Sequence, residues 1–202
     1  MSTYHHGDLR RALLRTAAEA IAESGPAALS LRELARRAGV SHAAPTHHFG
    51  DKAGLLTALA IEGYRLLADE LRLAAEESGS FLEVGVAYVR FAIGHRGHFE
   101  LMFRPDQVHA DDPELVAARV AGGEVLRRSL ADLPRTRDAS RPDSARGQGE
   151  ATALAAWALV HGFATLWLAG GFPTTLGDDP EQAARQVAKA LFDQPAPPSE
   201  TH

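Results

Sequence analysis

Residues 30–52 read SLRELARRAGVSHAAPTHHFGDK, and this stretch decides the fold that we expect for the chain. Ser30 and Glu33 have the S-x-x-E spacing of a capping box, which predicts the start of a helix. Gly39 follows at a position where a turn needs the positive φ that glycine adopts without strain. Ser41 is placed to cap a second helix. Two helices joined by a short turn containing glycine form the helix-turn-helix, whose second helix enters the major groove of DNA.

The same stretch resembles the N-terminal domain of the TetR family of transcriptional repressors. The matching elements are Ser30-Leu-Arg-Glu-Leu-Ala35, Ala38-Gly-Val-Ser41, His48-Phe49, and Asp51-Lys52 followed by Leu55-Leu56. The second helix departs from the family pattern, because Pro45-Thr46 stand where a typical member has an aliphatic residue and a tyrosine. From the exposed face of the motif and from the resemblance, the residues expected to contact DNA are Ser30, Arg32, Ser41, His42, Ala43, Thr46, His47, His48 and Lys52.

Lys52 is expected in the first turn of a further helix, with Asp51 as its N-cap. A cation at this end opposes the helix dipole, whereas free N–H groups at a helix start attract anions. A phosphate contact by Lys52 would explain this placement, and the resemblance implies one. The alternative is that Lys52 is simply exposed to solvent.

Composition indicates a chain that folds around an apolar core. It has 202 residues, 45% of them apolar, and no cysteine, which excludes disulfides and thiolate chemistry. We see no run of the ~20 apolar residues that a membrane span needs, and the first residues lack the apolar core of a signal peptide. We therefore expect a soluble, cytoplasmic protein without a membrane partner.

The charge is unevenly distributed. Residues 1–52 contain seven Lys and Arg against five Asp and Glu, a net charge of +2, whereas the remainder has a net charge of −7. A slightly basic end on an acidic body suits a protein that meets DNA with one end only. A chance fluctuation of surface charge could give the same asymmetry.

Apolar periodicity of the helical kind predicts an all-α chain of about nine helices. The resemblance, and the match of two reading helices to a palindromic operator, imply a two-fold dimer. The predicted domains are a helix-turn-helix DNA-binding domain over 5–65, with the reading motif at 30–49, and a ligand-binding and dimerisation domain over 66–195. Residues 134–149 read as a flexible linker and residues 194–202 as a disordered tail. The helices are expected at 7–24, 30–37, 41–48, 52–77, 80–97, from 113 onward, at 150–169 and from 180 onward, with a short aromatic-rich segment at 98–103.

The body is expected to pair subunits and to hold an effector. The resemblance implies that the last two helices form a four-helix dimer interface, and the stretch around Trp157 and His161-Gly162 resembles a TetR subfamily named for Trp and His-Gly. The expected interface residues are Leu154, Phe163, Trp167, Val187 and Leu191. The expected effector-binding residues are Tyr88, Phe91, His95, Phe99, Met102, Phe103, Trp157 and His161, although each could equally be part of the core.

The sequence therefore favours a DNA-binding regulator that a small-molecule effector releases from a palindromic operator, with no cofactor and no enzymatic activity. One alternative is an all-α, metal-assisted hydrolase that uses His95, His98 and His109. The chain lacks the H-E-x-x-H and G-x-S-x-G motifs and a phosphate-binding glycine loop. A second alternative is a DNA-binding dimer that responds to no effector.

Overall fold

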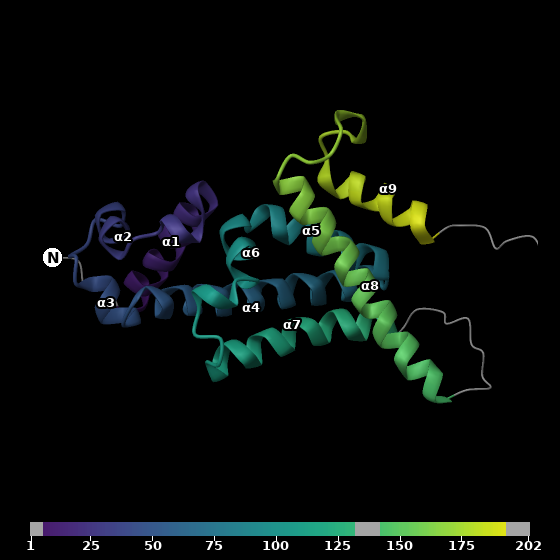
Figure 1. Cartoon of the computed structure of the whole chain (residues 1–202), viewed down its shortest axis with the longest axis horizontal. Coiled ribbons are helices and arrows are strands. Elements are labelled where there is room, and N and C mark those ends of the chain that lie inside the picture. Colours follow the sequence, from purple (N-terminus) through teal and green to yellow (C-terminus); the bar gives the residue numbers. More distant parts are fainter. Residues whose placement is uncertain (1–5, 132–141, 193–202) are drawn as a thin grey trace, which may run out of the picture.

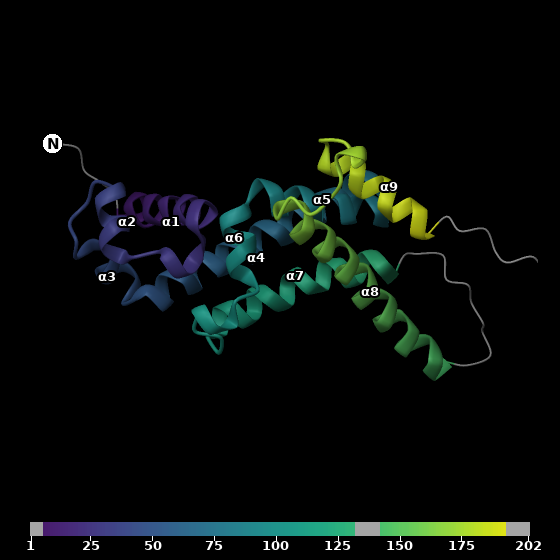
Figure 2. The same ribbon diagram turned by 45° about the horizontal axis from the view of Figure 1, so that its top comes forward.

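The computed structural model describes residues 6–131 and 142–192, and within these ranges it contains helices and no strand (Figures 1 and 2). Its elements are α1 His6–Ala28, α2 Leu31–Arg37, α3 Ala44–Phe49, α4 Lys52–Ser78, α5 Phe81–Gly94, α6 Arg96–Met102, η1 Pro105–Gln107, α7 Pro113–Ala131, α8 Pro142–Leu168, η2 Thr174–Leu176 and α9 Pro180–Phe192. The expected all-α fold with nine α-helices is confirmed for the described residues.

Helices α1, α2 and α3 form a small head at one end of the molecule, against the first turns of α4 (Figure 1). Leu13 of α1, Leu34 of α2 and Leu55 of α4 are fully buried in one apolar cluster. The helical path of α1 breaks at Gly25, whose φ is +76°, and Pro26 follows. The predicted end of the first helix at Gly25-Pro26 is therefore confirmed as a break in α1.

Helix α4 joins the head to the rest of the chain. Asp51 Oδ1 accepts a hydrogen bond from the Gly54 N–H at 2.7 Å, so the predicted N-cap is confirmed. The helix has 27 residues and ends at Gly79 in the left-handed conformation, which gives it a length of about 40 Å. Its buried residues run from Leu55 to Ala74. They belong to one cluster that continues from the head into the body.

The body is built around α5, which is buried on most of its surface between α4 on one side and α8 and α9 on the other. Helix α7 runs along α4 (Figure 2). A second apolar cluster joins α5, α8 and α9 through Val89, Phe163, Ala183 and Ala184. Helix α6 packs on α1 and thereby connects body and head a second time.

Two boundaries in the body differ from the expectation. The helix predicted over 80–97 is divided, because His95 leaves the helical conformation (φ −121°, ψ 43°) between α5 and α6. Ser80 is the N-cap of α5 but makes no side-chain hydrogen bond there, and the Glu83 carboxylate accepts from Arg185 of α9 at 2.8 Å.

Helix α8 begins at Pro142, so residues 142–149 of the predicted linker are helical. Proline at the first helical position needs no N–H partner, and the polar residues after it include good helix formers. The absence of an apolar stripe made this part look like a loop. The remainder of the predicted linker, 134–141, and the predicted tail, 194–202, lie outside the described residues.

One segment, Ala151–Leu168 of α8, is long and apolar enough to cross a membrane by length and composition, with a mean hydropathy of 1.5. This differs from the expectation that no such run exists, because Thr152, His161, Gly162 and Thr165 interrupt the run of apolar residues without making its mean hydropathy low. Only 17% of the segment is buried within the chain, and Leu154 and Leu166 are 57% and 50% exposed. A single helix of this kind is weak evidence for a membrane span. An apolar helix face that pairs two subunits has the same composition.

Candidate DNA-binding interface and body cavity

Helices α2 and α3 form the predicted helix-turn-helix. Ser30 is the N-cap of α2, and its Oγ accepts a hydrogen bond from the Glu33 N–H at 3.3 Å. Gly39 has a φ of +68°, as the turn requires. The Val40 N–H then donates to the Ala35 carbonyl at 3.0 Å and closes the end of α2. The local sequence therefore fixes the direction in which the chain enters α3.

Helix α3 is shorter than predicted and starts later. Its N-cap is Ala43, which makes no side-chain hydrogen bond, so the expectation that Ser41 caps this helix is wrong. The Ala44 N–H donates to the backbone carbonyl of Ser41, and the chain completes a turn before the helix begins. Pro45 is buried near the start of α3, where its missing N–H costs least.

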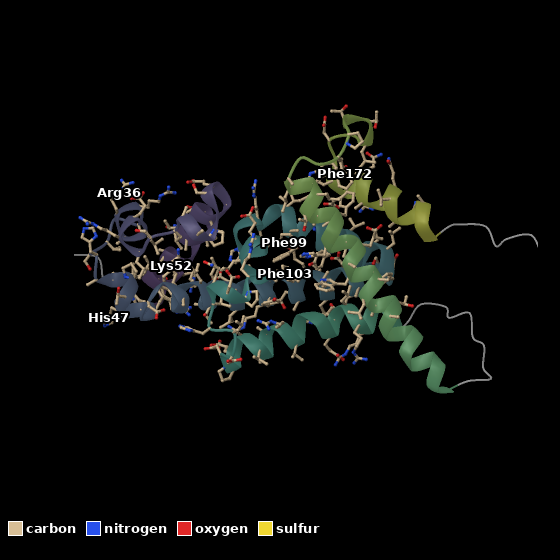
Figure 3. All side chains as sticks on the ribbon, in the orientation of Figure 1. Arg36, His47, Lys52, Phe99, Phe103 and Phe172 are labelled. Carbon is tan, nitrogen blue, oxygen red and sulfur yellow. The ribbon has the colours of Figure 1, made fainter. Side chains whose placement is uncertain are left out.

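The outer surface of this motif carries small polar and imidazole side chains. His42, Ala43, Thr46 and His47 are exposed, as expected, and His47 lies at the far end of the head (Figure 3). His48 is half-buried, with its ring centroid 6.1 Å from that of Phe49. The motif thus presents hydrogen-bond donors and acceptors to the outside, although their contact with DNA stays a prediction.

Three of the four charged residues of α2 form ion pairs with one another. The Glu33 carboxylate accepts from Arg36 at 2.6 and 2.8 Å and from Arg37 at 3.1 Å. Hydrogen bonds from these two guanidinium groups lower the pKa of Glu33 to about 2. Arg37 also donates to Glu23 of α1 at 2.7 Å. Glu33 therefore turns to the arginines and not to the Ser30 N–H, so only one half of the predicted capping box forms.

Lys52 connects two elements of the head. Lys52 lies in the first turn of α4 (Figure 3). Its Nζ donates a hydrogen bond to the Ala27 carbonyl at the end of α1 at 3.1 Å. A lysine ammonium has three N–H donors. The bond to Ala27 uses one of these donors and leaves the others for a phosphate. Lys52 therefore has a structural contact within the head, and its contact with a DNA phosphate stays a prediction. Arg32 of α2 is exposed.

The body contains a cavity of about 370 Å³ between α4, α5, α6, α7 and α8. Its lining is mostly apolar and aromatic, which is typical of sites for small organic ligands. A water molecule has a volume of about 30 Å³ in the liquid, so the cavity has room for a small organic molecule. The lining residues are Tyr64, Leu67, Leu71, Tyr88, Met102, Phe103, Pro105, Arg119, Gly122, Gly123, Leu126 and Trp157.

A chain of hydrogen bonds supports one wall of this cavity. Trp157 Nε1–H donates to the Tyr88 hydroxyl at 3.3 Å, and that hydroxyl lies 3.0 Å from His161 Nδ1. Burial raises the pKa of Tyr88 and lowers the pKa of His161. A neutral His161 accepts at Nδ1 from the neutral Tyr88 hydroxyl, which orders the three side chains. His161 also contacts Phe103, with ring centroids 4.5 Å apart.

The expected effector residues divide into three groups. Tyr88, Met102, Phe103 and Trp157 line the cavity. Phe99 and His161 pack directly behind it against Phe103, and Figure 3 shows Phe99 and Phe103 close together in the body. The predictions for Phe91 and His95 are wrong for this cavity. Phe91 is fully buried in the core, and His95 faces a different region.

Sequence reasoning missed Tyr64 and Arg119. Tyr64 lies in an apolar stripe of α4, which in the sequence alone looks like part of the core. The only signal for an effector site there is its hydroxyl group among aliphatic neighbours. Arg119 lies on the polar side of α7, where nothing in the sequence separates it from other exposed arginines.

His95 and His98 face an open groove of about 880 Å³ between the head and α6. His95 Nε2 lies 3.3 Å from Glu70, and His98 Nε2 lies 3.7 Å from Glu62. His109 is elsewhere, 3.5 Å from Asp51 in the head. The described residues contain no group of three ligands placed to hold one metal ion, so the three histidines of the hydrolase alternative are not brought together.

The expected dimer residues are also divided. Leu154 is exposed on α8, whereas Phe163 is 5% exposed and packs inside the protomer against Phe172, with centroids 4.9 Å apart. Phe163 thus packs within its own protomer, and its place in the dimer interface stays a prediction. Trp167 and Val187 are half-buried against the same cluster, and the side chain of Leu191 lies outside the described residues.

Comparison with known families assigns both parts of the chain. Residues 13–59 match the family model of bacterial regulatory proteins of the tetR family, and residues 81–191 match the tetracyclin repressor-like C-terminal domain. The chain belongs to the TetR family. Its N-terminal part is thus a DNA-binding helix-turn-helix of a transcriptional regulator. The TetR resemblance inferred from residues 30–52 is confirmed, whereas the Trp and His-Gly subfamily stays a prediction.

Solved TetR-like structures share this fold over almost the whole chain. A protein of unknown function from Rhodococcus sp. RHA1 is 33% identical with a TM-score of 0.73, covering 96% of this chain and 98% of its own. The TetR family regulator PfmR from Thermus thermophilus is 22% identical with a TM-score of 0.65, covering 90% and 97%.

The superantigen PfiT shares the fold with a TM-score of 0.64 at 19% identity, covering 89% of this chain and 93% of its own. No curated protein matches the chain.

Proposed function

We propose that this TetR-family protein is a repressor that binds a palindromic operator as a homodimer and leaves it when an effector enters the body cavity. The exposed surface of α3 carries this proposal. The proposed DNA contacts are Thr46 and His47 on α3 and His42 and Ala43 in the turn before it, with Ser30, Arg32, Ser41, His48 and Lys52 as further contacts. Polar side chains on a short exposed helix can reach base edges, while a lysine at a helix start can hold a phosphate.

A single helix of six residues contacts too few bases to select one site. A two-fold dimer doubles the contact and places two reading helices about 34 Å apart, one turn of DNA. The exposed apolar side of α8 supports this pairing. Leu154, Ala158, Gly162 and Leu166 recur every four residues on α8, and a Cβ on Gly162 would meet open space. A second α8 can therefore approach closely there, with α9 completing a four-helix interface.

Helix α4 is the proposed link between effector and DNA. Tyr64, Leu67 and Leu71 of α4 line the cavity, and Lys52 at its first turn belongs to the head. A ligand can shift the protein toward a conformation that does not fit the operator only if it binds that conformation more tightly. Contacts with α4 give the cavity a means to do so.

The domain assignment follows the same division, with DNA binding over 5–65 and effector binding and dimerisation over 66–195. A regulator that binds chromosomal DNA acts in the bacterial cytoplasm, which is the localisation that we propose.

Selection of genomic fragments by the purified protein tests the proposal. We expect enrichment of one or a few palindromic sites, with affinity that falls steeply as salt rises. A transcription assay from an enriched promoter then tests repression. Binding without sequence preference would contradict the proposal, and activation of the promoter would contradict repression.

A further inference from the structure

The inner part of the body cavity is apolar. Leu67, Leu71, Met102 and Leu126 are at most 8% exposed and line it from three helices. Phe103 and Trp157 continue this surface, with ring centroids 6.2 Å apart. Flat or aliphatic groups gain from burial against such walls, at about 25 cal/mol for each Å² removed from water. The inner part therefore selects a hydrocarbon or aromatic group.

The hydroxyl groups of the lining are already bonded to the protein. Tyr64 donates to the Met102 carbonyl at 2.7 Å, and the Tyr88 hydroxyl is held by His161 and Trp157. Burial raises the pKa of both tyrosines, so both stay neutral. A ligand needs no polar group at this depth to satisfy them.

Arg119 differs from the rest of the lining, because it is the one formally charged side chain among the lining residues. It is exposed on α7, and its Cζ lies 6.0 Å from the centroid of the Tyr64 ring. No carboxylate within the described residues forms an ion pair with it, although seven other arginines of the body are paired. A planar guanidinium matches a carboxylate through two parallel hydrogen bonds.

The cavity is small and remains open beside Arg119. Its volume of about 370 Å³ is near the lower end of the range of roughly 300–1,000 Å³ for organic ligands. Gly122 and Gly123 form part of the wall one turn after Arg119, and a Cβ on Gly123 would meet no atom within 4 Å. A compact ligand can thus lie inside while one end reaches the guanidinium.

We propose that the effector is a small organic monocarboxylate, with an aromatic or aliphatic body in the apolar part and its carboxylate on Arg119. This rests on the proposed function, in which the cavity holds the effector. The chemistry distinguishes such an acid from its neutral amide, which has the same shape and cannot form the ion pair.

Calorimetric titration of the full-length protein with two matched pairs tests the proposal. The pairs are 3-phenylpropionate with 3-phenylpropionamide, and octanoate with octanamide, at pH 7.5. We expect at least one acid to bind about tenfold more tightly than its amide. This factor is the lower end of what a hydrogen bond to a charged group contributes, because Arg119 is exposed. Arg119→Gln should bring acid and amide to equal affinity.

Arg127→Gln is the matched control, because Arg127 is also exposed on α7 but lies outside the cavity. It should keep the preference for the acid. Equal binding of acid and amide, an unchanged preference in Arg119→Gln, or no binding of either acid at millimolar concentration would each overturn the ligand class. Operator binding is measured on the same preparation. If the protein binds the operator but neither acid, this inference alone is overturned. If the protein does not bind an operator, the proposed function is overturned.

Discussion

The two ends of this molecule expose opposite kinds of surface. The head has a compact core and presents imidazole, hydroxyl and cationic groups from α2, α3 and the start of α4. The body exposes large apolar side chains on α8, such as Leu154 and Leu166, and encloses an aromatic cavity. A surface that binds DNA must remain hydrated and polar, whereas one that binds another subunit or an organic ligand gains from burial. This difference supports our proposal that DNA binds at one end and that a second subunit and an effector bind at the other.

The ends are joined in two ways. Helix α4 carries one continuous row of buried residues from head to body, and α6 packs closely on α1. Within the described residues, changes in the body can therefore reach the head mainly through these two contacts, and also through His109, which lies 3.5 Å from Asp51. Changes at each end should have separable effects, which the following variants test.

The largest effect is expected from charge on the apolar side of α8. The double variant Leu154→Glu, Leu166→Glu should be monomeric in sedimentation experiments, because burying carboxylates in an interface is unfavourable. Operator affinity should fall about 100-fold or more, since each head would bind one half-site alone. Leu73→Glu is the control, since Leu73 is 52% exposed on α4. A double variant that remains dimeric would remove this side of α8 from the interface.

The contact between α6 and α1 should be sensitive to a single methyl group. A Cβ on Gly97 would lie 2.0 Å from the Ala18 carbonyl oxygen, so one helix must move. We expect Gly97→Ala to lower the free energy of unfolding by about 2–3 kcal/mol, as overpacking does. In Gly94→Ala, the matched control, the added Cβ meets nothing within 4 Å. Equal stability of both variants in urea unfolding would mean that α6 and α1 do not depend on this approach.

Lys52 tests the polar end. Lys52→Met should weaken operator binding about tenfold and reduce the slope of log K against log [salt] by about 2, because a dimer loses two phosphate contacts at about 0.9 each. Arg72→Met, on the same helix and paired with Asp69 at 2.7 Å, should leave the slope unchanged. Anisotropy measurements at several salt concentrations give both values. An unaltered slope in Lys52→Met would leave its bond to Ala27 as its only role.

The smallest effect concerns an ion pair that holds α9 on α5. Both oxygens of Glu83 accept from Arg185, whose hydrogen bonds lower the pKa of Glu83, and both side chains are about one third exposed. The pKa of Glu83 is lower in the folded state than its value of about 4.5 in the unfolded chain. The pair therefore stabilises the folded state at pH values above about 4.5, and this contribution is lost as the pH falls through the lowered pKa.

Glu83→Gln should therefore cost about 0.5–1 kcal/mol at pH 7 and progressively less below about pH 4.5 in thermal unfolding. Glu76→Gln, an exposed residue of α4, serves as the control. A cost for Glu83→Gln that does not depend on pH would show that packing, and not charge, holds α9 in place.

The sequence was most informative where structure depends on local interactions. The Asp51 cap, the turn at Gly39 and the break at Gly25 are set by neighbouring residues, and all three are confirmed. Glu33 was predicted to complete a capping box, but its carboxylate pairs with Arg36 and Arg37 instead. Local capping is a weak preference, and a nearby charged partner outweighs it.

The cavity was harder to predict because it is made where distant helices meet. Trp157 and Phe103 were recognisable as aromatic residues, but whether a ring lines a cavity or fills the core depends on its neighbours. Phe163 and Phe91 are examples of the second case. Arg119 gave no signal at all, since its importance follows only from its place at the edge of the cavity.

The central claim is that two polar heads read DNA at a separation fixed by the paired bodies. Insertion of five base pairs at the centre of a selected operator rotates one half-site to the opposite face of the DNA while leaving both half-sites intact. We predict that affinity falls to the level of non-specific DNA and returns in part when ten base pairs are inserted. Equal affinity for the original and the five-base-pair operator would contradict a rigid, two-fold regulator.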